Sequence, residues 1–129
     1  MTEHPNAATV RRGAEAWNSG DLDVIRESFS DDVVFHFAGT NAMSGTYRGR
    51  DAVMDALARA SQGWSTHTDV ESFLVSDDHI MVFHHGTGEH EGTPYDVFPV
   101  IAMKLDSDGK VTEAWNLAND QRAWDQFWS

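Results

Sequence analysis

The sequence has no cysteine, few basic residues and no long apolar run, and each shortage excludes a class of site or partner. Without cysteine there are no disulfides, thiolate metal sites or cysteine nucleophile. Nine basic residues are set against 21 acidic ones, and the formal net charge of -12 would repel a nucleic-acid backbone or an anionic membrane. No segment approaches the roughly 18 apolar residues that a membrane-spanning helix needs.

The remaining composition is that of an ordinary globular domain. The chain has 129 residues, of which 40% are hydrophobic, and five Trp and seven Phe supply apolar area for a core. No repeat, linker or low-complexity tract divides it, so we expect a single domain over residues 1–129. The polar, acidic start does not resemble a signal peptide, and we expect a cytoplasmic protein.

Hydrophobic periodicity predicts the order helix, helix, strand, helix and then four strands. The predicted ranges are helices at 6–18, 22–29 and 51–62, strands at 33–38, 65–75, 79–89, 95–105 and 110–118, and a helical tail at 119–128. Asn6, Asp21 and Asp51 are the predicted N-caps, Gly20 ends the first helix, and the glycine-rich stretch 39–49 reads as a loop. Helices gathered on one side of an antiparallel sheet define an α+β domain, and curling of such a sheet leaves a cavity at its mouth.

Four motifs in this order resemble SnoaL-like proteins of the nuclear transport factor two-like, ketosteroid-isomerase-like superfamily. The motifs are AWNSGDLD at 16–23, FSDDVV at 29–34, YRGRDAV at 47–53 and KVTEAW at 110–115. The resemblance implies a conical, strongly curved antiparallel sheet with helices packed on its concave side, a cystatin-like α+β roll. It also implies a homodimer formed through the outer face of the sheet.

The resemblance leaves the reaction open, because the superfamily includes isomerases, polyketide cyclases, hydrolases and pockets without catalysis. One hypothesis is a cofactor-independent acid/base enzyme acting on a small hydrophobic molecule. The other is a non-catalytic module that binds a small ligand or assembles a dimer. The enzyme hypothesis is favoured, because a pocket that only binds an apolar ligand does not need both acidic residues and histidines. We expect no cofactor.

Three residues are candidates for proton transfer, which needs a carboxylate or imidazole inside an apolar cavity. His36 shares a strand face with Val34 and Ala38, and it either points into the cavity or is a hydrogen-bonded core histidine. Asp120 lies near the position at which cyclases of the SnoaL type place a basic carboxylate. It is equally placed to cap the terminal helix. Asp96 either shares an inward face with apolar neighbours or is exposed at the start of its strand.

A second set of residues is predicted to contact the ligand. Asn116 offers a neutral hydrogen bond and Tyr47 a phenol, and the predicted apolar contacts are Trp17, Phe98 and Trp115. The alternating His67, Asp69 and Glu71, and the adjacent His84 and His85, raise the alternative of a metal site. Charged residues at alternate positions of an outer strand are usually only solvated, so we expect no bound metal.

Overall fold

The computed structural model describes residues 3–61, 65–90 and 92–127. The helices are α1 (Pro5–Ser19), α2 (Leu22–Glu27), α3 (Arg50–Ser61) and α4 (Gln121–Phe127). The strands are β1 (Phe29–Phe37), β2 (Gly45–Arg48), β3 (Ser65–Val75), β4 (His79–His90), β5 (Thr93–Val97), β6 (Pro99–Leu105) and β7 (Val111–Ala118). This is the predicted α+β class; position 128 of the predicted tail lies outside the described residues.

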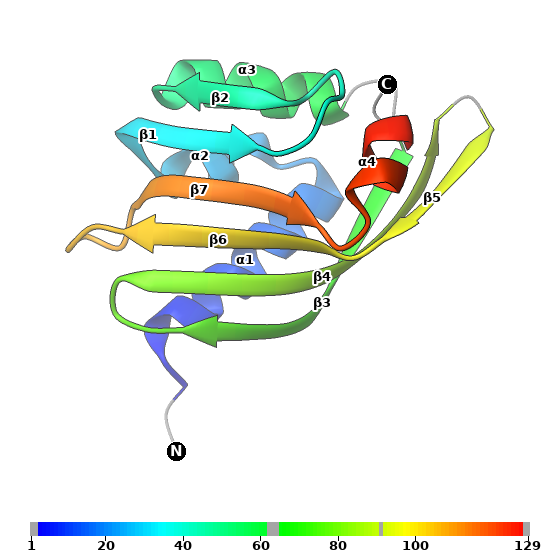
Figure 1. Ribbon diagram of the computed structural model, residues 1–129. Helices are drawn as coiled ribbons and strands as arrows, with labels where there is room; N and C mark the ends of the chain where they lie inside the picture. Colours follow the sequence, from blue (N-terminus) through cyan, green and yellow to red (C-terminus); the bar gives the residue numbers. More distant parts are fainter. Residues whose placement is uncertain (1–2, 62–64, 91, 128–129) are drawn as a thin grey trace.

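One seven-stranded sheet runs in the order β2-β1-β7-β6-β4-β3, and β5 also pairs with β4 (Figure 1). The pairs among the last strands are antiparallel, as predicted. The pairing of β1 with β7 is parallel, so the sheet is mixed rather than purely antiparallel. The long connection through α3 and five strands lets β7 return beside β1 in the same direction.

The strands differ from the prediction in three main places. Strand β1, predicted at 33–38, begins at Phe29, within the range predicted for the second helix. The stretch 39–49, predicted as a loop, contains β2, which pairs with β1 between Val34 and Phe37. The predicted strand 95–105 is interrupted at Phe98, whose backbone N–H donates to Asn119 Oδ1 at 3.0 Å. This break divides the segment into β5, which pairs with the end of β4, and β6, which pairs with its start.

The caps of the helices follow the prediction in part. Asp21 caps α2 by accepting from the Val24 N–H at 3.4 Å, and Gly20 follows α1 in the left-handed region with φ of 75°. The prediction for Asp51 was wrong, because α3 begins one residue before it, at Arg50, and Asp51 pairs with Arg26 instead.

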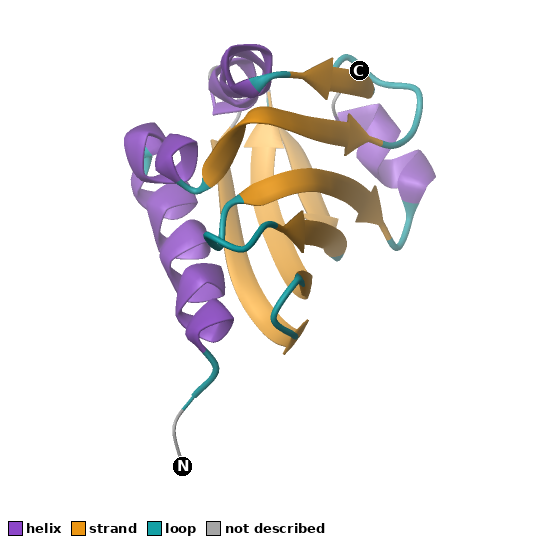
Figure 2. Cartoon of the chain, turned by 90° about the vertical axis from the view of Figure 1, so that its left-hand side faces the viewer, coloured by secondary structure: helices purple, strands orange, loops and turns teal. Residues whose placement is uncertain are grey.

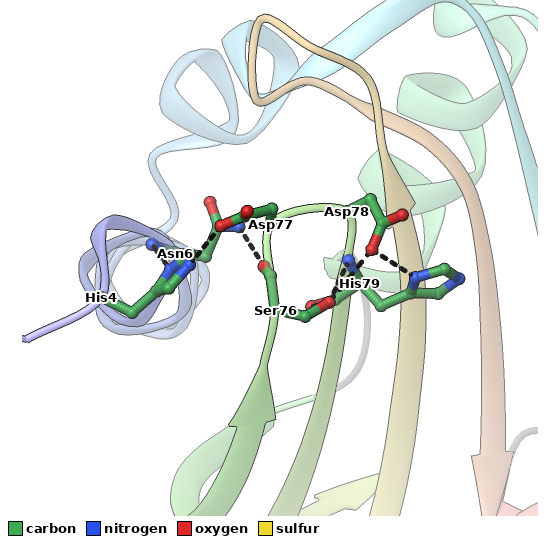
Figure 3. Close-up of polar contacts among 6 residues, drawn as sticks. All are labelled: His4, Asn6, Ser76, Asp77, Asp78 and His79. Atoms are coloured by element: carbon green, nitrogen blue, oxygen red, sulfur yellow. Dashed lines mark hydrogen bonds and ion pairs between the residues drawn. The ribbon is translucent and has the colours of Figure 1, made fainter.

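The start of α1 is held by a different residue from the one predicted (Figure 3). His4, not Asn6, is the N-cap, and its Nδ1 accepts from the Asn6 N–H at 3.1 Å. The Asn6 side chain instead donates to the Ser76 carbonyl at 2.7 Å, and His4 Nε2 lies 2.9 Å from Asp77 Oδ1. The N-terminus of α1 is thereby tied to the turn between β3 and β4.

The sheet has an inner face that carries the core and an outer face that is open. Along β1 the buried residues are Val33, Phe35 and Phe37, and along β4 they are Ile80, Val82 and His84. These define the inner face, against which α1 packs through Val10. Figure 2 shows α1 and α2 along one side of the curved sheet. In the described part of the chain, no helix has the length and apolarity needed to cross a membrane.

Candidate functional site

A cavity of about 750 Å³ lies between the inner face of the sheet and the helices. Its lining is mainly apolar and includes Val10, Trp17, Phe29, Phe35, Phe37, Met43, Leu57, Val82, Ile101, Met103 and Trp124. Both Val111 and Asn116 of β7 contribute to the lining, and five residues of strand span about 16 Å. The cavity therefore extends along the strands and is wide enough for a small molecule.

His84 is the buried titratable group of this lining. Strand alternation places its side chain with Ile80 and Val82 on the inner face, where it is 7% exposed. Burial lowers the pKa of His84 below its ordinary value of 6.5, and a hydrogen bond to the Pro99 backbone opposes that shift. Nδ1 is buried without a hydrogen-bond partner.

Asn116 supplies a second buried acceptor. It follows the fully buried Ala114 by two residues on β7, so its side chain also points inward. Its Oδ1 is buried and has no hydrogen-bond partner. Strand β6 lies between β4 and β7, and Ile101 of β6 is directly opposite Asn116. Ile101 in turn pairs with Val82 of β4, so Asn116 is level with Val82 and lies two strands away from His84, offset by two residues along the sheet.

Helix α4 covers this end of the cavity and lies beside β5 (Figure 1). Trp124 of α4 lines the cavity and is 8% exposed. The next residue, Asp125, accepts hydrogen bonds from Asn41 Nδ2 at 2.7 Å and Gln121 Nε2 at 3.0 Å. These hydrogen bonds hold the pKa of Asp125 below its ordinary value, and the bond from Gln121 has the largest effect. The Asp125 carboxylate thus fastens α4 to the loop between β1 and β2.

The charged residues that line the cavity lie away from His84 and Asn116. Glu27 ends α2, and Asp108 and Lys110 belong to the turn between β6 and β7. Lys110 Nζ donates to the Glu27 carbonyl at 2.5 Å, and Arg12 on α1 is exposed. In the described lining, carboxylates occur at Glu27 and Asp108, at the opposite end of β7 from Asn116. The region around His84 and Asn116 is accordingly apolar apart from uncharged hydrogen-bonding groups.

The structure places the predicted catalytic histidine on the outer face. His36 alternates with the inward Phe35 and Phe37, its Nε2 lies 2.7 Å from Glu113 Oε2, and its ring stacks on Trp115 at 5.5 Å. Alternation correctly grouped His36 with Val34, but that group of side chains faces away from the cavity. The catalytic role of His36 stays a prediction, and its contacts are those of an ion-paired surface residue.

The two predicted catalytic carboxylates are exposed. Asp120 Oδ1 accepts from the Ala123 N–H at 3.1 Å, which is the helix cap that the sequence offered as an alternative role. Asp96 Oδ1 lies 2.7 Å from His85 Nε2 on the outer face. The structure therefore does not bring Asp120, Asp96 and His36 together, and their part in catalysis stays a prediction.

Two of the five predicted ligand contacts, Asn116 and Trp17, line the cavity. Tyr47 packs at the edge of the core and donates its hydroxyl to the Met43 carbonyl at 2.9 Å. Trp115 and Phe98 are on the outer face, where Phe98 stacks on the His85 ring at 4.7 Å.

Sequence reasoning missed His84 as a cavity residue. It had paired His84 with His85 as possible metal ligands, whereas alternation along β4 sends the two rings to opposite faces. The sequence pattern that could have identified His84 is the alternation Ile80, Val82, His84, in which the histidine follows two apolar residues on the same strand face. Within the described residues, no cluster of three or more His, Asp or Glu is arranged to hold a metal ion.

Comparison with known proteins supports the same fold. Bal32a, from a soil-derived mobile gene cassette, is 31% identical over 96% of both chains with a TM-score of 0.89. A nuclear transport factor two-like protein from Burkholderia xenovorans is 21% identical, covers 100% of this chain and 99% of its own, and has a TM-score of 0.80. TerC, co-crystallised with polyporic acid, is 19% identical over 96% of this chain and 98% of its own, with a TM-score of 0.83.

Sequence comparison leads to the family. An uncharacterised protein from Mycobacterium tuberculosis is 26% identical over 132 residues, which cover 100% of both chains. The family model of the SnoaL-like domain matches residues 10–114, which is most of the chain; the match runs from within α1 to within β7 and includes His84. The chain belongs to the SnoaL-like domain family.

Proposed function

We propose that this protein binds a small hydrophobic molecule in the cavity and that His84 is the base of a cofactor-independent proton transfer on it. The observation that carries the proposal is a buried histidine, His84, in an otherwise apolar cavity lining to which Asn116 also contributes. A buried titratable group in an apolar cavity is a candidate for proton transfer. The structural neighbour TerC, which was co-crystallised with polyporic acid, supports a small-molecule ligand for this fold.

The environment of His84 suits a base. Its lowered pKa favours the uncharged ring at neutral pH, and an uncharged imidazole has one nitrogen whose lone pair can take a proton. A proton taken from one atom of the substrate can be returned by the same nitrogen to another, which is the balance of an isomerisation. Asn116, uncharged at all pH values, orients the substrate without competing for the proton.

A substrate screen with matched variants tests this function. The expected result is a ligand from a panel of steroids, aromatic polyketides and terpene epoxides that raises the melting temperature by several degrees at saturation. His84→Gln is expected to retain binding and to lower turnover at least a hundredfold, because an amide cannot relay a proton. Asp120→Asn serves as the control outside the cavity.

The variant results separate the two hypotheses. Full turnover by His84→Gln contradicts a base at this position. Loss of turnover in Asp120→Asn, with His84→Gln active, would transfer the role back to the carboxylate predicted from the sequence. Binding without any turnover in the unsubstituted protein would leave a ligand-binding module.

We also propose that the outer face of the sheet forms a homodimer. Leu74, Met81, Ala102 and Trp115 are successive cross-strand partners, and Phe83, Val100 and Leu117 form a second such row. Leu74 is 66% exposed and Leu117 46%, which is costly for an isolated chain. Light scattering on the purified protein is expected to give twice the chain mass, and Leu117→Asp is expected to give a folded monomer. A monomeric unsubstituted protein would contradict the dimer.

A further inference from the structure

We propose that ligands enter the cavity between the middle of α1 and the β6–β7 turn (residues 106–110), and that Gly13 keeps this entrance open. The inference rests on the proposed ligand-binding function and adds to it the route that the ligand takes. It concerns a part of the lining that has no role in the proposed proton transfer.

The first step locates the place where the cavity meets solvent. Most of the described lining residues are buried or half-buried, but a few are exposed. The exposed ones are Pro5, Arg12 and Gly13 of α1, Glu27 of α2, and residues 108–110 of the β6–β7 turn. A residue that lines a cavity and is also exposed marks an opening in its wall. The cavity therefore opens at this end, whereas Trp124 of α4, which is 8% exposed, covers the other.

The second step is how the two sides of the opening are held. Near the start of α1, Asn6 Nδ2 donates to the Ser76 carbonyl at 2.7 Å. Near its end, Asn18 Nδ2 donates to the Thr68 carbonyl of β3, also at 2.7 Å. Both ends of the helix are thus tied to β3 or to the turn that follows it, which leaves the middle of α1 as one side of the opening.

The β6–β7 turn is held by a different element. Lys110 Nζ donates to the Glu27 carbonyl at 2.5 Å, which ties the turn to the end of α2. Among the residues that the structure describes, no hydrogen bond or ion pair joins α1 to this turn. Each side of the opening is therefore fixed from behind, and nothing bridges the two.

The third step is the glycine itself. Gly13 lies in the interior of α1, where glycine destabilises a helix relative to alanine. Its φ is not positive, and a Cβ added to it would meet nothing within 4 Å. Neither backbone conformation nor packing within the chain explains a glycine here. Because Gly13 is exposed and lines the cavity, the space beside it is part of the opening, and glycine leaves that space to a molecule passing through.

Stopped-flow binding of N-phenyl-1-naphthylamine, an uncharged fluorescent apolar probe, tests this route on the full chain. Gly13→Trp is expected to slow association and dissociation alike, by about tenfold, because both directions use the obstructed passage. The affinity is expected to change little, which distinguishes an entrance from a binding contact. Asp108→Trp narrows the opening from the exposed turn and is expected to act in the same direction, so it carries the test if Gly13→Trp does not fold.

Two further variants of α1 are controls. Ala8 is exposed and is not among the described lining residues, so Ala8→Trp adds the same bulk to the helix and is expected to keep both rates. Gly13→Ala is expected to raise the urea midpoint of unfolding, because alanine is the better helix former and its Cβ position is empty. A lower midpoint would show that the fold itself requires the glycine and would overturn its assignment to the entrance.

NMR shifts of methyl groups show where the probe binds. Val82 and Leu57 report on the cavity wall, and Leu74 and Leu117 report on the outer face. If the cavity methyl groups shift, unchanged rates in both Gly13→Trp and Asp108→Trp, or equal slowing in Ala8→Trp, would overturn the entrance and leave the pocket standing. Shifts confined to the outer face, or no binding of the probe, would overturn the proposed pocket together with this inference.

Discussion

His84 and His85 are consecutive residues of β4, yet they occupy opposite environments. His84 is buried on the inner face with a partnerless Nδ1. His85 is on the outer face, where Nε2 is 2.7 Å from Asp96 and Nδ1 is 3.8 Å from Glu71. The difference arises from strand alternation alone, and it shows that residue type gives no role until the buried face is known.

The same contrast holds for the two faces as a whole. The outer face pairs its histidines with carboxylates, as in His36 with Glu113 and His85 with Asp96. The inner face surrounds its histidine with apolar side chains and leaves Nδ1 without a hydrogen-bond partner. We therefore propose ligand binding on the inner face and dimer assembly on the outer one.

The largest expected effect is the difference in stability loss between substitutions at two adjacent apolar residues, one on each face of the sheet. Ile80 is 1% exposed and Met81 is 39% exposed. Ile80→Ala is expected to lower the free energy of unfolding by about 2–5 kcal/mol, because it leaves a cavity in the core. Met81→Ala is expected to cost less than about 1 kcal/mol. Urea unfolding at a concentration where the chain is monomeric measures both, and equal losses would contradict the assignment of the faces.

The sequence predicted most of the helices and strands, since hydrophobic periodicity is a local property, but two of the three predicted N-caps were wrong. Strand alternation correctly predicted which side chains of β1 share a face. It did not predict which of the two faces is buried, because each face begins with a valine, Val33 on one and Val34 on the other. Strand β2 was missed because it has only four residues and lies in a stretch interrupted by glycines at 39, 45 and 49. The break at Phe98 depends on Asn119, 21 residues away, which no local pattern reveals.

The site was less predictable for a related reason. Asp120 satisfies both a cap and a catalytic pattern, and only the 3.1 Å contact with the Ala123 N–H shows its use at the helix. The cavity joins residues from α1, β4, β7 and α4, and their meeting depends on sheet order and curvature. The parallel pairing of β1 with β7 is a tertiary property of this kind.

An intermediate effect is expected from two glycines with positive φ. Gly39 has φ of 93°, and an added Cβ would lie 2.1 Å from Asp125 Oδ1. Gly20 has φ of 75°, and an added Cβ would meet nothing within 4 Å. Gly20→Ala is expected to cost about 1–2 kcal/mol of backbone strain.

Gly39→Ala is expected to cost about 1 kcal/mol more, because it also displaces the Asp125 carboxylate that fastens α4. Urea unfolding gives both values, and Trp124 fluorescence reports whether α4 has moved. Equal destabilisation of the two variants, with unchanged fluorescence, would show that the contact around Asp125 does not hold the helix.

The smallest expected effect is in the pH dependence of stability. The pKa of His84 is lower in the folded chain than its ordinary value of 6.5, so the unfolded chain binds more protons between those two values. The stability contributed by the neutral ring is present above pH 6.5 and is lost as the pH falls through the folded pKa. His84→Phe is expected to flatten this dependence, and His85→Phe to retain it. An unchanged dependence in His84→Phe would contradict the burial of the ring.

The most direct test of the account is an NMR titration of the histidine side chains in the unsubstituted protein. We expect His84 to be uncharged at pH 7 and to titrate below 6.5. A small-molecule ligand should move this resonance and leave that of His85 in place. If His84 titrates at or above 6.5 and does not respond to any ligand that binds, the base assigned to the cavity is contradicted.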